Sequence, residues 1–245
     1  MKNITIDQIY ERKSVRQYLD KDITKEDKKL IFDSIIQAPT AGNMSLYSVI
    51  EVSDQSIKDK LVISCDNQPF IASAPLVLVF LADYKRWFDL FSHYSNDLRS
   101  LDSGDLFLAM SDALIAAQNA VVAAESLGIG SCYIGDILEK YEYHQELFKL
   151  PNGVIPVGML CFGYPTELQK TRKKPNRFKK EDLFHLNHYQ EASIDSLKEM
   201  IKEKQNLTEE KLSTWVKAFL ERKHNGDFSI EMSRSVNEMI KAWRK

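Results

Sequence analysis

Apolar and polar residues alternate in two patterns along this chain, and each pattern predicts a different kind of element. Apolar residues three or four positions apart predict helices around Ile6 and Ile9, after Thr24, and over ranges 55–64, 84–91 and 139–148. Thr24 followed by Asp27 is typical of a helix N-terminal cap. Runs of β-branched and aromatic residues predict strands over 47–52, 76–81 and 154–162. The wholly apolar run 76–81 predicts a strand that is covered on both faces.

The longest predicted helix runs over 106–127 and is rich in alanine. Small side chains let helices approach closely, so this helix is predicted to pack centrally or at a dimer contact. Four polar residues argue against a membrane span, namely Asp112, Gln118, Asn119 and Glu125. Gly128 is predicted to end the helix in the left-handed conformation. A short strand then leads to a turn at Gly135.

The last part of the chain is predicted to be helical from about Ser193 and carries two apolar stripes. The first contains Leu212, Trp215, Val216, Phe219 and Leu220, and the second contains Val236, Met239, Ile240 and Trp243. We interpret both as packing surfaces rather than ligand-binding positions. The change in composition predicts a domain over 1–190 and a helical C-terminal extension over 191–245, packed on the same domain or on a dimer partner.

Charge and cysteine content restrict the function. The 245 residues include 33 Lys and Arg against 35 Asp and Glu, so the net charge is −2. No overall basic field marks a nucleic-acid or membrane binder, and any basic site must be local. The N-terminus shows no apolar segment of a signal peptide. Three cysteines without CxxC spacing fit a reducing compartment, so we expect a cytoplasmic protein.

Three cations and a hydroxyl fall within five residues near the N-terminus, in the stretch Arg12-Lys13-Ser14-Val15-Arg16. If this stretch is extended, alternation places Arg12, Ser14 and Arg16 on one side. Guanidinium groups offer forked donors that match phosphate oxygens, so the three side chains favour a phosphate site. A solvated basic stretch is the alternative.

Two later segments have a distinctive composition. Residues 38–43 (Ala-Pro-Thr-Ala-Gly-Asn) favour a tight loop with exposed backbone N–H groups, although an ordinary helix-to-strand connection has the same composition. Residues 170–180 contain seven basic residues and no acid. A solvated loop and a nucleic-acid patch are the alternatives there, and the lack of interleaved stacking aromatics weakens the second.

Other common site motifs are not supported. Gly128-x-Gly130 has Tyr133 where a Rossmann fingerprint needs a glycine, and it follows a helix instead of a strand. His185 and His188 lack a convincing third ligand, so no metal site is predicted and both are interpreted as structural. Cys132 and Cys161, in apolar strands, are interpreted as packing residues.

The order and spacing of four segments resemble the FMN-dependent nitroreductase family. They are Arg-Lys-Ser-Val-Arg at 12–16, the loop at 38–43, the helix end Ala-Glu-Ser-Leu-Gly-Ile-Gly at 124–130, and Gly-Tyr-Pro at 163–165 before the basic run. Gln118-Asn119-Ala120, Tyr133-Ile134-Gly135 and Lys174-Pro175 look most like the larger NADPH-preferring flavin oxidoreductase branch. The resemblance covers about residues 5–190. It implies an α+β sandwich, with a mostly antiparallel central sheet flanked by helices and a helical C-terminal extension.

The resemblance also implies a homodimer with FMN at the subunit interface. The implied phosphate contacts are Arg12 and Ser14 with neighbouring Lys13, and Lys174 and Arg177 from the basic run. Arg16 would lie by the N1/O2 edge of the flavin, where a cation stabilises the charge that gathers on reduction. The residues bordering the ring or ribityl chain would be Pro39, Thr40, Ala41, Asn43, Gln68, Tyr133, Ile134, Gly135 and Asp136, with a backbone N–H near N5.

Several of these positions depart from the family pattern. The branch often has His-Arg where this chain has Arg12-Lys13, and serines where it has Pro39-Thr40-Ala41. Arg177 is displaced by one residue. The second glycine after Tyr-Ile-Gly is Asp136 here, which bears on the flavin potential and on substrate preference.

The implied chemistry is a ping-pong cycle in which NAD(P)H passes hydride to flavin N5 and a small acceptor then uses the same face. No protein side chain is needed as a catalytic acid or base. Nitroaromatics, quinones, flavins and similar small acceptors are the implied oxidants. A non-catalytic FMN carrier or sensor is one alternative, and a nucleic-acid-binding protein that uses 170–180 is another. Within the family, reductive dehalogenation and oxidative flavin chemistry stay open.

The choice between NADPH and NADH also stays open. Arg222, Lys223 and His224 could contact a 2′-phosphate, but an exposed helix end explains them equally well.

Overall fold

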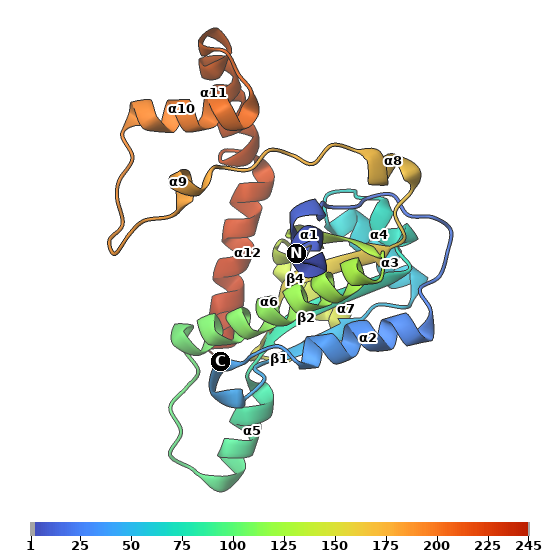
Figure 1. Cartoon of the computed structure of the whole chain (residues 1–245). Helices are drawn as coiled ribbons and strands as arrows, with labels where there is room; N and C mark the ends of the chain where they lie inside the picture. Colours follow the sequence, from blue (N-terminus) through green and yellow to red (C-terminus); the bar gives the residue numbers. More distant parts are fainter. Residues whose placement is uncertain (1–2, 245) are drawn as a thin grey trace. The chain divides into compact units, whose positions relative to one another are not determined.

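The computed structural model describes residues 3–244. Its strands are β1 (Tyr47–Glu51), β2 (Leu76–Asp83), β3 (Gly130–Ile134) and β4 (Val154–Gly163). Its helices are α1 (Ile4–Glu11), α2 (Lys25–Ile36), α3 (Gln55–Ser64), α4 (Phe70–Ser73), α5 (Lys85–Tyr94), α6 (Ser103–Ser126), α7 (Tyr141–Phe148), α8 (Glu167–Thr171), α9 (Lys180–Leu183), α10 (Ile194–Gln205), α11 (Glu209–Lys223) and α12 (Asp227–Trp243), with 3₁₀ turns η1 (Ala41–Asn43) and η2 (Asp136–Leu138) (Figure 1). The predicted helices and strands are therefore confirmed, with ends shifted by a few residues. The Thr24 hydroxyl accepts the Asp27 N–H at 3.0 Å, as the cap predicted.

The strands form one sheet in the order β1-β2-β4-β3, and each neighbouring pair is antiparallel. Beyond β3, Ser14 forms a single parallel bridge with Ser131. The sheet is thus mostly antiparallel, and the predicted α+β class is confirmed.

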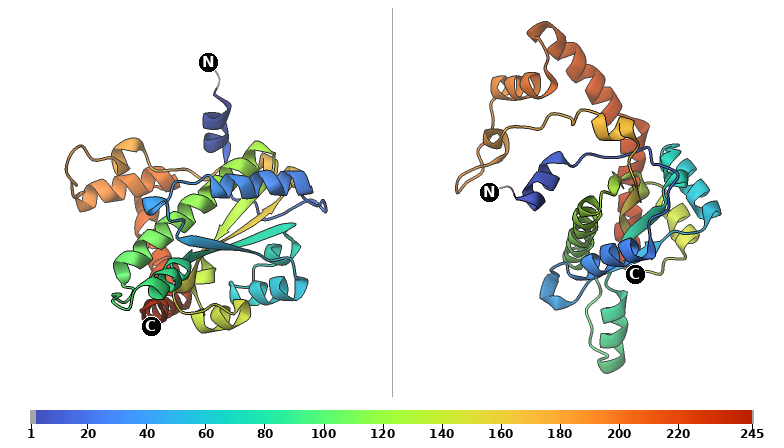
Figure 2. Two further views of the ribbon diagram at one scale, coloured as in Figure 1. Left: turned by 90° about the horizontal axis from the view of Figure 1, so that it is seen from below. Right: turned by 45° about the vertical axis from the view of Figure 1, so that its right-hand side comes forward.

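Side chains of β2 alternate between two apolar clusters. Leu76, Leu78 and Phe80 belong to the cluster that contains residues of α2 and α6. Val77 and Val79 belong to the cluster that contains residues of α3 and α4. Helices therefore cover both faces of the sheet (Figure 2, left), as the apolar run 76–81 predicted.

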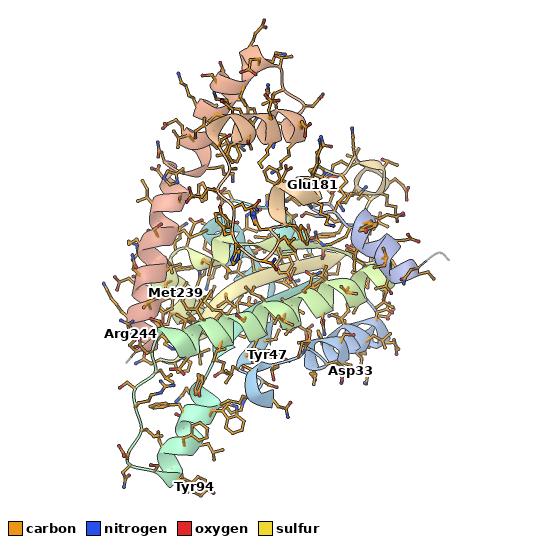
Figure 3. The ribbon with its side chains drawn as sticks, turned by 60° about the vertical axis from the view of Figure 1, so that its left-hand side comes forward. Asp33, Tyr47, Tyr94, Glu181, Met239 and Arg244 are labelled. Atoms are coloured by element: carbon orange, nitrogen blue, oxygen red, sulfur yellow. The ribbon has the colours of Figure 1, made fainter. Side chains whose placement is uncertain are left out.

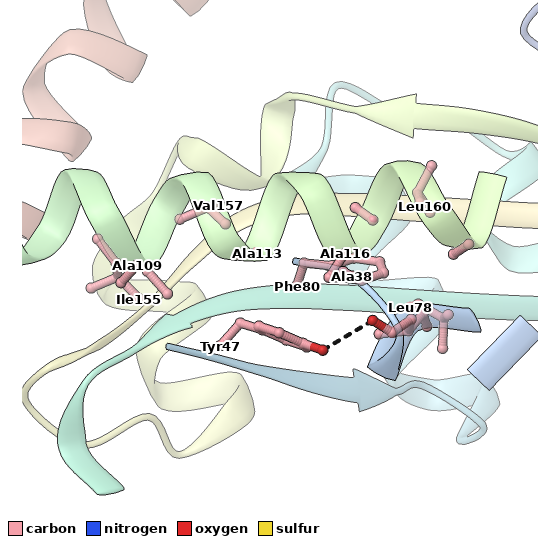
Figure 4. Packing of buried hydrophobic residues seen from close by; sticks show 14 of the residues in the cluster. Ala38, Tyr47, Leu78, Phe80, Ala109, Ala113, Ala116, Ile155, Val157 and Leu160 are labelled. Carbon is pink, nitrogen blue, oxygen red and sulfur yellow. Dashed lines mark hydrogen bonds between the residues drawn. The ribbon is translucent and has the colours of Figure 1, made fainter. Parts of the chain in front are cut away.

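Alanines form the inner face of α6. Ala109, Ala113 and Ala116 are fully buried and lie against strand side chains such as Phe80 (Figure 4). By length and composition α6 could cross a membrane, but its inner face fills the core of this fold. Gly128 ends the helix with φ 72°, as predicted.

The chain divides into two compact units, residues 1–172 with 231–245 and residues 173–230. Within the first unit, Met239 (Figure 3) and Trp243 of α12 are buried in the core. The indole N–H of Trp243 donates to Asp102 O at 3.2 Å. Packing is thus confirmed for the second stripe. Within the second unit, the rings of Trp215 and Phe219 stack 4.8 Å apart. These units differ from a division at residue 190, and the assignment of FMN binding to 1–190 stays a prediction.

Candidate functional site

The segment 12–16 is extended and lies beside β3. The Val15 N–H donates to Ser131 O at 2.9 Å, and the Val15 side chain is buried. A Cβ on Gly130 would lie 2.5 Å from Val15 Cγ2, so a glycine is needed for this close approach. Because Val15 faces inward, its neighbours Ser14 and Arg16 face the opposite side.

The side chains of Arg12, Ser14 and Arg16 converge near the thiol of Cys132. Burial raises the pKa of Cys132, whereas Arg16, Ser14 and Arg12 each lower it. Burial also raises the pKa of Tyr133 to about 12, and Arg12 again acts in the opposite direction. All three predicted side chains therefore act on one position of β3, as the alternation predicted.

The unfilled donors of this cluster fit an oxyanion. Arg12 Nε is buried and has no hydrogen-bond partner within residues 3–244. Arg172 donates from one terminal nitrogen to Ser14 O at 2.6 Å, while its Nε is likewise buried without a partner. Guanidinium donors match phosphate oxygens, so this donor set fits the phosphate of FMN. Arg172 was missed from the sequence, where it was one cation among seven in a basic run.

Lys13 has a structural role at the end of α8. Its ammonium donates to Lys170 O and to Arg172 O, each at 2.6 Å. These carbonyls belong to the C-terminal end of the helix, where a cation is stabilising. Lys13 thereby connects the 12–16 segment to residues 170–172, and its predicted contact with FMN stays a prediction.

The loop 39–43 is tight, as predicted, with Gly42 and Asn43 in the left-handed region. Its Ala41 N–H is not exposed, however. It donates to Asp112 Oδ1 of α6 at 2.9 Å, and Leu46 N–H donates to Asp112 Oδ2 at 3.0 Å. The expectation of exposed N–H groups is therefore wrong at Ala41, because a buried carboxylate takes this donor.

Asp112 was not recognised as part of the site from sequence. The available signal was its position between Ala109 and Ala113 on the face that the alanines share, because a buried acid there must find donors. Pro39 and Thr40 lie at the start of the same loop, where Thr40 Oγ1 accepts the Ser45 N–H at 3.2 Å.

Two predicted residues from distant segments meet at the end of β3. Gln68 Nε2 donates to Asp136 Oδ2 at 2.7 Å and to Cys65 O at 2.9 Å. Ile134 is buried, but a Cβ on Gly135 would meet nothing within 4 Å. Open space therefore adjoins the backbone of Gly135, where the resemblance implies a flavin.

Lys174 and Arg177 belong to the second unit. Together with Lys173 and Lys204 they line a groove of about 530 Å³ in that unit. Asn176 Nδ2 donates to Lys204 O at 3.1 Å, and this hydrogen bond connects the segment of Lys173, Lys174 and Arg177 to Lys204. The groove thus gathers positive charge, while the predicted contact of Lys174 and Arg177 with the FMN phosphate stays a prediction.

His185 of the second unit makes ordinary contacts within its own loop. His185 accepts the Gln190 N–H at 3.4 Å, and its ring lies 4.8 Å from that of Tyr189. Within residues 3–244 no group of three His, Cys, Asp or Glu side chains is placed to hold a metal ion.

Comparison with known proteins agrees with this fold. Residues 9–164 match the family model described as Nitroreductase family. An FMN reductase (NADPH) of Bacillus subtilis (strain 168) is 34% identical over 189 residues, which are 76% of this chain and 75% of that protein. An NADPH-flavin oxidoreductase of Vibrio harveyi is 31% identical over 219 residues, 87% of this chain and 88% of that protein. The solved NADPH:FMN oxidoreductase from Vibrio harveyi complexed with NAD+ superposes with a TM-score of 0.81 at 26% identity, over 97% of this chain and 98% of that chain. The chain therefore belongs to the nitroreductase family.

Proposed function

We propose that this protein is an FMN-dependent NAD(P)H oxidoreductase that reduces small acceptors such as nitroaromatics, quinones or flavins. The observation that carries the proposal is the convergence of Arg12, Ser14 and Arg16 beside β3, where the buried Nε of Arg12 has no hydrogen-bond partner among the described residues. This cluster lies in the part of the chain that matches the family. Relatives of the chain include an FMN reductase (NADPH) and an NADPH-flavin oxidoreductase.

The cation cluster has two roles in this proposal. Arg12 and Ser14 hold the FMN phosphate, and the resemblance adds Lys174 and Arg177 of the basic run to the proposed phosphate ligands. Arg16 stands by the N1/O2 edge, where its positive charge favours reduction. When bound, FMN supplies two-electron chemistry, taking hydride from NAD(P)H and delivering it to the acceptor in a ping-pong cycle.

The remaining predicted residues border the flavin. The 39–43 loop is held in place by Asp112, so it offers a fixed wall for a flat ring. The backbone of 133–136 follows the end of β3 and has open space at Gly135. Rigid elements position a ligand more accurately than mobile loops do.

We further propose a homodimer with FMN at the subunit interface. The outer face of α6 supports this, because Phe107 is 70% exposed and Leu108 and Ile115 are also exposed. Ile4 and Ile9 of α1, a helix that contacts α6, are exposed as well. A second copy of the chain would cover these exposed apolar side chains. The three cysteines are free and buried, which supports the cytoplasm as the compartment.

The first test is a visible spectrum of the purified protein before and after anaerobic addition of NADPH, then of NADH. A yellow protein that bleaches supports the oxidoreductase. A yellow protein that neither reductant bleaches supports an FMN carrier or sensor instead. A colourless protein that takes up no added FMN overturns the proposal.

A further inference from the structure

The hydrogen bond between Gln68 and Asp136 is held by rigid local structure on both sides. Gln68 follows Asp66 and Asn67, which both have left-handed backbone conformations. Asp136 begins the turn η2 directly after β3. The 2.7 Å contact therefore joins two segments whose backbones are each fixed by a tight turn.

The donors of the Gln68 amide are fully used. An amide nitrogen has two hydrogens, and Cys65 O and Asp136 Oδ2 receive them at 2.9 and 2.7 Å. A backbone carbonyl and a carboxylate only accept hydrogen bonds, so their positions fix the nitrogen on this side. Toward a ligand, Gln68 can offer only its carbonyl oxygen, and Asp136 can offer only carboxylate oxygens.

Two buried thiols reveal that the site has ends of opposite charge. At Cys132 the charged neighbours are cations, since Arg16 and Arg12 lower its pKa against the effect of burial. At Cys65 burial raises the pKa to about 12, the hydrogen bond with Ser64 lowers it, the charges of Asp136 and Glu139 raise it further, and the charge of Lys140 lowers it. The 12–16 end thus presents the cations Arg12 and Arg16, whereas the other end presents the Asp136 carboxylate beside Gln68.

We propose that Asp136, held by the Gln68 amide, determines acceptor specificity by placing a fixed negative charge and an acceptor-only edge at one end of the flavin site. This inference rests on the proposed function. The charge opposes Arg16, so it lowers the midpoint potential of bound FMN. It also repels acceptors that carry an anionic group, and the protein therefore prefers uncharged or cationic nitroaromatics and quinones.

The test uses the full-length holoprotein and the variant Asp136→Asn, which removes the charge but keeps an oxygen for the Gln68 amide. We expect the midpoint potential of bound FMN to rise by about 30 mV. For a two-electron couple this is a tenfold change in the equilibrium constant for reduction. We expect the ratio of kcat/KM for 4-nitrobenzoate to that for 4-nitrobenzamide to rise roughly tenfold as well. The two compounds differ in charge but hardly in size.

The chain supplies a matched control on α3. Gln55 Nε2 donates to Asp59 Oδ1 at 2.9 Å and to Ala72 O at 3.2 Å, which repeats the chemistry of the Gln68 amide at an exposed place. Asp59→Asn is expected to change neither the potential nor the ratio. Asp136→Ser replaces the carboxylate with a smaller, uncharged side chain. It must shift the midpoint potential and the acceptor ratio in the same direction as Asp136→Asn.

The outcomes separate this inference from the proposed function. If the wild type binds and reduces FMN but neither Asp136 variant shifts the potential or the acceptor ratio, the role of Asp136 is overturned alone. If the wild type takes up no FMN, the proposed function fails and this inference fails with it. A shift of equal size in Asp59→Asn would also overturn the inference, because the effect would then not depend on position.

Discussion

The buried carboxylate of Asp112 accepts a hydrogen bond from the backbone N–H of Ala41 at 2.9 Å. Its second oxygen accepts the N–H of Leu46 at 3.0 Å. One side chain of the core helix α6 thus satisfies a donor of the loop predicted to border the flavin and a second donor three residues after that loop. The shape of that loop therefore depends on a residue that would not touch the ligand.

Asp112→Asn is expected to lower the free energy of unfolding by about 2 kcal/mol, because the amide offers one acceptor oxygen where two donors converge. FMN affinity should fall with it. Urea denaturation of the apoprotein and FMN titration measure the two effects. Asp33→Asn, at an exposed pair with Lys29, is the control and should change stability by less than about 0.5 kcal/mol. Equal stability of Asp112→Asn and wild type would refute the anchoring role.

Gly130→Ala is expected to displace the 12–16 segment from β3, because the new Cβ would lie 2.5 Å from Val15 Cγ2. We expect a loss of about 2 kcal/mol in stability and weaker FMN binding. Val15→Ala combined with Gly130→Ala should recover part of the stability and part of the FMN binding, since it removes the Cγ2 methyl that the new Cβ would contact. Gly104→Ala has nothing within 4 Å of the new Cβ and serves as the control. Unchanged FMN binding in Gly130→Ala would show that the close contact does not position the cation cluster.

Arg16→Ala is expected to weaken FMN retention or to slow its reduction by NADPH. The loss of one charge-assisted hydrogen bond predicts a 10- to 100-fold effect, that is, about 1.5–3 kcal/mol. FMN titration and anaerobic stopped-flow reduction measure it, with Lys29→Ala on the exposed surface of α2 as the control. Flavin content and rates equal to those of the wild type would remove Arg16 from its assigned role.

His144 should make the protein less stable in mild acid. Its ring is fully buried, and Nε2 lies 2.9 Å from Ser64 Oγ. Burial lowers the pKa of His144 to about 4, below the value of about 6.5 in the unfolded chain. Between these values the unfolded chain binds a proton that the folded protein does not, so stability falls as the pH falls.

The measurement is urea denaturation at several pH values from 7 to 4. The contribution of His144 is up to about 3 kcal/mol over this range, and His144→Gln should therefore lose less stability on acidification than the wild type. His93→Gln on α5, whose side chain is exposed, is the control. Glu139 acts in the opposite direction, because burial and the charge of Asp136 raise its pKa to about 7. The difference in pH dependence of stability between His144→Gln and the wild type isolates the contribution of His144. If stability falls equally with pH in both proteins, His144 is not the cause of the acid sensitivity.

Ile115→Glu is expected to dissociate the proposed dimer, because it places a charge on the exposed apolar face of α6. Analytical ultracentrifugation of the holoprotein should show a shift from dimer to monomer, together with loss of bound FMN if the cofactor needs both subunits. Lys29→Glu, which changes charge on an exposed part of α2, is the control. A wild type that sediments as a monomer with bound FMN would contradict the interface.

Local pattern was sufficient to predict the strands and the longer helices of this fold, whereas the short helices α4, α8 and α9 were not predicted. The β2 run and the alanine face of α6 were recognised because strand and helix periodicity depend only on residues close in sequence. The same reasoning placed Arg12, Ser14 and Arg16 on one side of an extended segment. Strand order was not accessible in this way, because it depends on which distant segments pair.

Contacts between individual residues of the site could not be predicted from the sequence either. Gln68 and Asp136 were each predicted to border the flavin, but their hydrogen bond joins segments that are 68 residues apart. Lys13 was included among the cofactor-binding residues because of the family resemblance. Its ammonium donates to carbonyl oxygens at the end of α8, and the periodicity of the sequence does not predict this contact.

The return of the chain through α12 has a consequence for synthesis on the ribosome. Trp243 fills the core of the first unit and bonds to Asp102, 141 residues earlier. A nascent chain has made every strand of the sheet and the whole of 173–230 before this side chain exists. The surface that Trp243 later covers must therefore stay open to solvent and to chaperones until α12 has been made. Truncated products would carry that apolar surface permanently, and quality control should recognise them by it.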